Sequence, residues 1–323
     1  YYPYFYPRLK VLELIQIIAG LALLYYGGNF LVTGSVRLAH FLKISLFVVG
    51  STVMAFGTST PELAVSILAA IDGTSELAMG NVIGSNIANI CLVLGLTSLI
   101  FTIAIRPDRL KRESPPLILA SILILVIAWD LQINRLEGLF MVSLLGIYVW
   151  RSLSHKENFS QELEEDTHLF AGKGPVFQIF LIVLGLVLVV GGAKLLIKGG
   201  VGIALTQGIS EWFIGITIVA IGTSLPEIVS SLIAARRGHA EMAIGNIFGS
   251  NIFNILMVLG LTATVHPLYI KEPIQPDLII ATMITFLLVA MITYGNHSLG
   301  KQKGLILLLT YFAYLGLKAT GSL

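Results

Sequence analysis

Charged side chains are scarce in this chain. Only 12% of its 323 residues are Asp, Glu, Lys or Arg, whereas 56% are hydrophobic, and the mean hydropathy is +0.88. A water-soluble domain of this length carries about twice that charged fraction. The composition therefore excludes an ordinary soluble protein and indicates a polypeptide that crosses a lipid bilayer several times. The formal net charge of +2 says little about partners and does not favour a nucleic acid.

Cysteine and enzyme motifs are also lacking. Cys91 is the single cysteine and lies in a hydrophobic run, so the chain cannot form an internal disulfide and this thiol is expected to be a small buried side chain. Neither the His-Glu spacing of zinc enzymes nor a Gly-x-Ser-x-Gly elbow occurs, and all six histidines lie at or near expected loops. Without these motifs we expect no enzyme and no cofactor, and nothing in the sequence indicates an obligatory protein partner.

We do not expect residues 1–7 to be a signal peptide, because they lack a positively charged start followed by a small-residue cleavage site.

Long apolar segments dominate what remains. A helix that spans a bilayer needs about 20 mostly apolar residues. Ten segments are candidates, and they cover residues 11–36, 44–70, 77–102, 115–129, 136–153, 176–200, 211–235, 241–265, 277–294 and 303–319.

One stretch of 41 residues occurs twice. Residues 57–97 and 222–262 align without a gap at an offset of 165, and 24 of the 41 positions are identical. Each copy places one glutamate, Glu62 or Glu227, inside a strongly apolar run. A carboxylate at membrane depth costs several kcal/mol unless a cation or proton accompanies it. The matched pair therefore predicts two halves of one cation site.

The repeat extends beyond these 41 residues. Three glycines spaced by seven recur at the same offset, which predicts two long helices with smooth, closely packed faces. These glycines are Gly20, Gly27 and Gly34 in the first half and Gly185, Gly192 and Gly199 in the second. We therefore predict a five-helix repeat over 1–153, a polar linker over 154–174 and a second five-helix repeat over 175–323.

An odd number of helices in each repeat has a topological consequence. If the first half begins outside, the second must begin inside, so the prediction is an all-α membrane protein with ten transmembrane helices in two inverted five-helix repeats. Such repeats are typical of secondary transporters, which bind their substrate at mid-membrane between the halves. Placing the N-terminus outside puts Arg106, Arg109, Lys111 and Arg112 in the cytoplasm, as the positive-inside rule requires. Both termini are then expected outside and the linker inside.

The repeated motif offers oxygen ligands. Pro61 lacks a backbone N–H and should kink its helix and free the carbonyl oxygen of Gly57. Thr58 and Glu62 stand four residues apart and so share one helix face. Ser85 and Asn89 have the same spacing, and the second copy repeats the set with Thr223, Ser224, Glu227, Ser250 and Asn254. Hydroxyl, carboxylate and amide oxygens suit Ca²⁺ or Na⁺ better than Zn²⁺ or Cu⁺.

Polar residues in membrane helices have other uses. Ser, Thr and Asn often hydrogen-bond neighbouring helices, and we expect this role, or a cap, for Asn81, Asn86, Asn246 and Asn251. The two glutamates could also be neutral, hydrogen-bonded acids. A passive cation channel is a further alternative, although pores are usually built by subunits around an axis normal to the membrane.

In these motifs the chain resembles the cation/calcium exchanger superfamily. The two alpha-repeats of that family carry G-T-S-x-P-E and G-N-x-x-G-S-N, and both occur here in both halves, at 57–62 and 80–86 and at 222–227 and 245–251. The resemblance covers nearly the whole chain, is closest to the sodium/calcium and prokaryotic branch, and implies a plasma-membrane antiporter that exchanges Ca²⁺ for a monovalent cation. By position it implies ion ligands at Thr58, Ser59, Glu62, Ser85, Asn89, Thr223, Ser224, Glu227, Ser250 and Asn254, with backbone oxygens near Ala55 and Ala220.

The chain departs from that pattern at two ligand positions. Several sodium-coupled members have an aspartate where this chain has Asn89 or Asn254. Glu62 and Glu227 then supply two formal charges, which neutralise one Ca²⁺. We expect Na⁺ as the coupling ion, but this departure leaves protons as an alternative, and Mn²⁺ or Mg²⁺ are alternatives to Ca²⁺.

Overall fold

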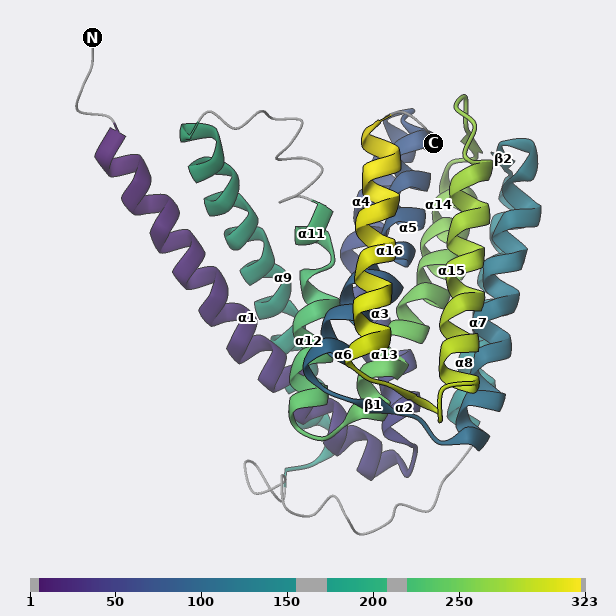
Figure 1. Ribbon diagram of the computed structural model, residues 1–323, viewed down its shortest axis with the longest axis horizontal. Helices are drawn as coiled ribbons and strands as arrows, with labels where there is room; N and C mark the ends of the chain where they lie inside the picture. The colour runs from purple at the N-terminus through teal and green to yellow at the C-terminus, as the bar shows by residue number, and fades with distance from the viewer. Residues whose placement is uncertain (1–5, 155–172, 208–219, 321–323) are drawn as a thin grey trace.

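The described part of the chain is mostly helical (Figure 1). The computed structural model describes residues 6–154, 173–207 and 220–320. Helices before the linker are α1 (Tyr6–Leu42), α2 (Leu46–Val49), η1 (Gly50–Met54), α3 (Ala55–Thr58), α4 (Thr60–Ile71), α5 (Ser75–Ala88), η2 (Asn89–Leu94), α6 (Gly95–Ile100), α7 (Pro107–Ile127), η3 (Ala128–Asp130) and α8 (Arg135–Ser154). Helices after it are α9 (Pro175–Thr206), α11 (Ala220–Thr223), α12 (Leu225–Arg236), α13 (Ala240–Phe253), η7 (Asn254–Leu259), α14 (Gly260–Val265), α15 (Gln275–Thr293) and α16 (Lys301–Ala319). Three of the segments, η1, η2 and η7, are π-helical.

Seven helical segments in the described part of the chain are long and apolar enough to cross a membrane. The count is eight if Leu46–Thr58 and Thr60–Ile71, which are bent by 42° at their junction, form one span. Two expected spans are not among them. One covers residues 211–235 and lies partly outside the described residues, and the other is α16, where three lysines dilute the apolar sequence.

Several expected boundaries differ from the structure: α1 ends at Leu42 rather than at 36 and α9 at Thr206 rather than at 200, and the largest error is at the start of α7. The span expected over residues 115–129 begins at Pro107, because α7 continues through Pro115 and Pro116. Charged residues of this segment, expected in a loop, belong to the helix, and Arg109 is only 1% exposed. Pro107 explains the early start, since proline fits the first turn of a helix, whose N–H groups have no partner within the helix.

The two longest helices pack through the predicted glycines. A Cβ atom at Gly20 would lie 2.8 Å from the carbonyl oxygen of Gly192, and one at Gly27 would lie 2.9 Å from that of Gly185. These contacts bring backbone against backbone, so the prediction of smooth facing surfaces is confirmed. Positions that ascend in α1 meet positions that descend in α9, so the two helices run antiparallel, side by side and tilted, at one flank of the molecule (Figure 1).

Two pairs of short strands join the halves. The strand β1 (Ile103–Ala104) pairs with β4 (Ser298–Leu299), and β2 (Gln132–Ile133) pairs with β3 (Leu268–Tyr269). At the offset of 165, β1 corresponds to β3, and β2 overlaps the position of β4. The two small sheets lie at opposite ends of the helix bundle (Figure 1). Equivalent loops of the two halves therefore lie at opposite ends of the molecule.

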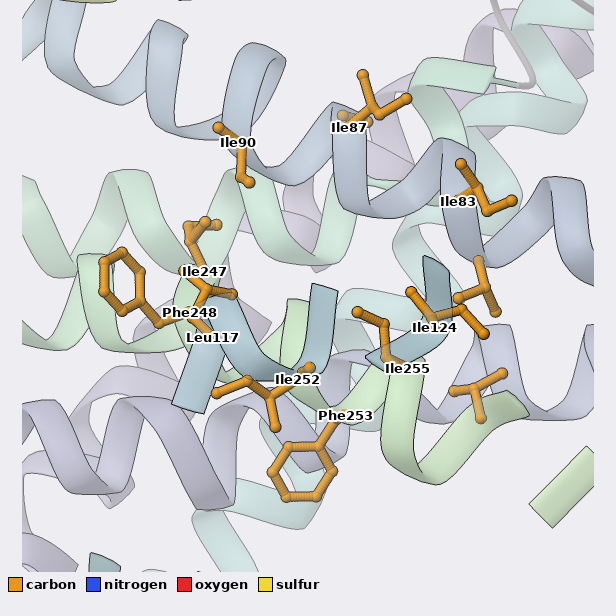
Figure 2. Packing of buried hydrophobic residues seen from close by; sticks show 14 of the residues in the cluster. Ile83, Ile87, Ile90, Leu117, Ile124, Ile247, Phe248, Ile252, Phe253 and Ile255 are labelled. Atoms are coloured by element: carbon orange, nitrogen blue, oxygen red, sulfur yellow. The ribbon is translucent and has the colours of Figure 1, made fainter. Parts of the chain in front are cut away.

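The helices that carry the second part of the motif form the centre. Figure 2 shows the apolar packing around them, with Ile87 on α5, Leu117 on α7, and Ile247 and Phe248 on α13. Phe248 also meets Phe47 edge to face, with ring centroids 5.9 Å apart. Close packing of this kind leaves few voids and resists deformation. It surrounds the polar motif residues with a rigid frame.

Candidate cation site

Both glutamates stand where a helix is interrupted. The helix α3 ends at Thr58 and α4 begins at Thr60, with Ser59 between them; in the second half α11 ends at Thr223 and α12 begins at Leu225. Pro61 and Pro226 occupy the first turn of the new helix, followed by Glu62 and Glu227. The kink predicted from Pro61 is therefore confirmed. A carboxylate in the first turn is stabilised by the unpaired N–H groups of the helix start.

The two carboxyl groups are buried and near each other. Glu62 is 3% exposed and Glu227 1%, and they lie close enough to interact electrostatically. The hydroxyl of Thr58 lies near the Glu227 carboxyl group without a hydrogen bond of normal geometry. Two like charges in this setting repel each other strongly. A cation or protons between them would remove that repulsion.

Several buried oxygens around these acids have no hydrogen-bond partner among the described residues. They come from three pairs of equivalent residues, namely Glu62 (Oε2) and Glu227 (Oε1 and Oε2), Ser59 (Oγ) and Ser224 (Oγ), and Asn89 (Oδ1) and Asn254 (Oδ1). Leaving a buried polar atom unpaired costs about 1–3 kcal/mol. The set totals seven oxygens, and Ca²⁺ takes six to eight.

The donor chemistry is that of a hard cation. The part of the chain that the structure describes holds no group of three or more His, Cys, Asp or Glu side chains suited to a metal ion. Two carboxyl groups supplemented by hydroxyl and amide oxygens lack the sulfur and imidazole donors that Zn²⁺ and Cu⁺ prefer. The arrangement suits an alkali or alkaline-earth cation.

The remaining expected ligands differ in their access to solvent. Thr58 and Ser250 are fully buried, and their hydroxyl oxygens lie 3.2 Å apart. Their equivalents, Thr223 and Ser85, instead line a cavity. The carbonyl oxygen of Ala55 accepts hydrogen bonds from the Ser59 amide at 3.0 Å and from the Thr58 hydroxyl at 3.5 Å. Ala220 begins α11, and its side chain lies outside the described residues.

Three asparagines of the motif hold helices together. Asn81 donates to the Ser66 hydroxyl at 2.9 Å and to the carbonyl oxygen of Glu62 at 3.1 Å. Asn246 donates to the hydroxyls of Ser230 and Ser231 at 3.1 and 3.2 Å. These bonds confirm the interhelical role expected for Asn81 and Asn246. Asn86 also bonds across helices, and Asn251 donates within its own helix to Ile247.

A cavity of about 250 Å³ reaches the site beside α16. Its lining comprises Gly80, Asn81, Gly84, Ser85, Ala88, Thr223, Ser224, Tyr311, Tyr314, Leu315 and Lys318. The equivalent glycines of the second half are covered, because Gly245 lies against the carbonyl of Phe47 and Gly249 against that of Ser51. The site is therefore open toward the end of the bundle where α16 terminates and closed toward the other.

Comparison with known proteins now assigns a family. A family model described as sodium/calcium exchanger protein matches residues 12–154 and 177–319. The chain belongs to the sodium/calcium exchanger family. The two matched segments are themselves displaced by 165 residues, so the family pattern occurs once in each half of this exchanger.

Relatives match most of the length of this exchanger. The putative antiporter CaxA of Alkalimonas amylolytica is 36% identical over 93% of this chain and 96% of its own length. The sodium/calcium exchanger MaX1 of Methanosarcina acetivorans is 32% identical, with the same coverage of the two chains. A solved structure of the sodium-calcium exchanger NCX_Mj, soaked with zero Na⁺ and Ca²⁺, superimposes with a TM-score of 0.82 at 33% identity and covers 95% of this chain and 98% of that one. The chain is thus a multi-pass membrane exchanger rather than an enzyme.

Sequence reasoning missed the mouth of the exchanger's cavity. Tyr314 and Lys318 lie on the last helix, far from the repeated motif, and no spacing rule connects them to it. Both bind Asp277 of α15: the Tyr314 hydroxyl at 3.1 Å and the Lys318 ammonium at 2.7 Å. Their place at the cavity follows from tertiary packing, which composition and periodicity do not encode.

Proposed function

We propose that this exchanger moves Ca²⁺ in one direction and Na⁺ in the other, at one site shared by its two halves. The observation that carries the proposal is the set of seven unpartnered buried oxygens contributed by equivalent residues around Glu62 and Glu227. Their number matches the coordination of Ca²⁺, and the two carboxylates balance its charge. The names of the relatives MaX1 and NCX_Mj point to the same pair of ions.

The proposed ligands are those expected from the sequence, namely Glu62, Glu227, Ser59, Ser224, Asn89, Asn254, Thr58, Thr223, Ser85 and Ser250, with the carbonyls of Ala55 and Ala220. Na⁺ would compete for the same oxygens. Exchange follows because the empty site, with two bare carboxylates, is costly to enclose in the membrane. The protein then changes its facing direction only with an ion bound.

The proposed architecture is ten spans in two inverted repeats, 1–153 and 175–323. Two observations support inversion: α1 runs antiparallel to α9, and equivalent loops lie at opposite ends of the bundle. We place the protein in the plasma membrane, with both termini outside and the linker 154–174 in the cytoplasm. In this orientation the cavity beside α16 opens to the outside. Alternating access would require α1 and α9 to shift along the bundle, and their glycine-lined contact suits such shear.

Proton coupling is the second candidate. It is favoured by the amides at Asn89 and Asn254, which leave no negative charge beyond the two glutamates for additional Na⁺ ions. Protons on the two acids would displace Ca²⁺ without any further ligand.

One experiment separates the candidates. Purified protein in liposomes is given an Na⁺, a K⁺ or a pH gradient, each alone, and ⁴⁵Ca²⁺ uptake is followed. Uptake driven by internal Na⁺ supports the proposal, and uptake driven by the pH step without Na⁺ replaces it by proton exchange. Ca²⁺ flux that needs no opposing gradient and drives no counter-transport would identify a channel.

A further inference from the structure

Asn86 forms a hydrogen bond with Asn254, which is one of the candidate ligands. The Nδ2 group of Asn254 donates a hydrogen bond to Oδ1 of Asn86 at 3.1 Å. Asn86 in turn donates from its own Nδ2 to the carbonyl oxygen of Asn251 at 3.3 Å. Asn86 is buried at 8% exposure and Asn254 at 0%. The two bonds form a relay that leads from the backbone of α13 through α5 and back to the start of η7.

The relay has a defined direction. A backbone carbonyl only accepts, so Asn86 must turn its NH₂ toward Asn251 and therefore its oxygen toward Asn254. That oxygen also only accepts, so Asn254 must present its NH₂ to Asn86. The remaining atom, Oδ1 of Asn254, is buried and has no partner among the described residues. The segment η7, which Asn254 begins, packs against α4, where Glu62 occupies the first turn.

The other half lacks this relay. By the repeat, Asn89 is the counterpart of Asn254 and Asn251 that of Asn86. The NH₂ group of Asn251 donates a hydrogen bond to the carbonyl oxygen of Ile247 in its own helix, at 2.9 Å. Its side-chain oxygen accepts no hydrogen bond from the described residues. Both side-chain atoms of Asn89 lack a partner as well. A hydrogen bond thus fixes the orientation of the Asn254 amide in this state, whereas no hydrogen bond from the described residues fixes that of Asn89.

We propose that Asn86 is a positioning residue that holds the oxygen of Asn254 toward the bound cation. The inference rests on the proposed cation site. Without Asn86, the Asn254 amide is free to turn its NH₂ toward the carboxyl groups of the site and donate a hydrogen bond there. A cation would then have to displace that bond and would meet a positive dipole end in place of an oxygen. Ca²⁺ affinity therefore depends on Asn86, which does not itself touch the ion.

A merely structural role for Asn86 makes a different prediction. Asn86 joins α5 to α13, so its loss lowers stability whether or not Asn254 carries an amide. Positioning instead requires the amide of Asn254, so its effect on affinity must vanish once that amide is removed. A double-mutant cycle separates the two, because it isolates the coupling between residues in contact.

The cycle compares wild type, Asn86→Leu, Asn254→Ala and the double variant. The half-saturating Ca²⁺ concentration for ⁴⁵Ca²⁺ uptake is measured in Na⁺-loaded proteoliposomes, and the melting temperature of each protein is recorded. Because a buried donor left without its partner is costly, we expect Asn86→Leu to raise the half-saturating concentration about tenfold when Asn254 is present. In the Asn254→Ala background we expect less than a twofold change. Equal effects in both backgrounds would overturn the inference.

Two further variants control for general damage and for misfolding. Asn251→Leu alters the equivalent position without breaking the relay, because Asn86 bonds to the backbone of Asn251, and it should leave the half-saturating concentration within twofold. An increase as large as that of Asn86→Leu would assign the effect to general damage. If Asn86→Leu does not purify as a folded protein, Asn86→Ser enters the same cycle with the same criteria. Absence of saturable uptake in wild type would instead refute the proposed function.

Discussion

The hydroxyl oxygens of Thr58 and Ser250 lie 3.2 Å apart, and they come from opposite halves of the chain. Their equivalents, Thr223 and Ser85, line the cavity that enters the site. The same combination of Thr and Ser is therefore buried on one side of the site and lines a cavity on the other. This asymmetry leads to a first prediction about solvent access.

Thr223→Cys should react with a membrane-impermeant thiol reagent added at the face where α16 ends, whereas Thr58→Cys should not. The reason is that Thr223 is exposed in the cavity and Thr58 is fully buried. Labelling is read by a mass shift of the purified protein. Wild type serves as the blank, because Cys91 is fully buried. Equal labelling of both variants would contradict the one-sided cavity.

Glu62→Gln and Glu227→Gln should each reduce ⁴⁵Ca²⁺ uptake into Na⁺-loaded vesicles by at least about tenfold, since each removes half of the charge that balances the ion at a buried site. The uptake rate at saturating internal Na⁺ is the measurement. Glu272→Gln is the matched control, because that carboxyl group is exposed. Normal uptake in either site variant would disprove the shared site.

Gly192→Ala should destabilise the protein by about 1–3 kcal/mol, the usual cost of forcing an extra methyl group into a tight contact. A Cβ there would lie 2.8 Å from the carbonyl oxygen of Gly20. Gly191→Ala, one residue earlier, should be neutral, because nothing lies within 4 Å of its added Cβ. Melting temperatures in detergent give the comparison. Identical values for the two variants would show that the α1–α9 contact is not tight.

Lys318→Met should lower the half-saturating Ca²⁺ concentration at the cavity side about two- to threefold at low ionic strength, because it removes the positive charge that neutralises the Asp277 carboxylate near the mouth. Asp277→Asn should act in the opposite direction by leaving the ammonium group alone. Both effects should shrink as salt is raised, since screening becomes strong at separations beyond about 10 Å at 0.1 M. Salt-independent effects would indicate a change in packing instead.

Lys173→Cys tests the orientation. Lys173 is exposed at the end of the linker, so in intact cells its cysteine should be labelled only after the reagent reaches the cytoplasm. Labelling is compared in whole cells and in inverted vesicles. Reaction from outside would reverse the proposed topology.

The parts of the structure that follow from local rules were predictable. Pro61 lacks an N–H, and the chain bends beside it; glycines spaced by seven lie on one helix face, and α1 and α9 meet along them. Two buried acids in repeated motifs predicted each other's proximity, and Glu62 and Glu227 do interact. Each of these features depends on a residue type and a short spacing.

Other features depend on the state of the whole molecule. The halves share the same motifs, so no reading of the sequence distinguishes Gly80, beside open space, from Gly245, against the backbone of Phe47. The start of α7 was missed although Pro107 is a local signal for a first helical turn, because Arg109 and the paired prolines resemble a loop until tertiary contacts bury the arginine. The π-helical turns that begin at Asn89 and Asn254 do not follow from the residue spacing of the motif.

The crossed strand pairs have a consequence for biosynthesis. Each small sheet takes one strand from either side of the linker. When the ribosome has completed the first half, β1 and β2 have no hydrogen-bonding neighbours, and Glu62 has no opposing acid. The first half must therefore remain in the bilayer with these strands unpaired until the second half is inserted, when both sheets can form.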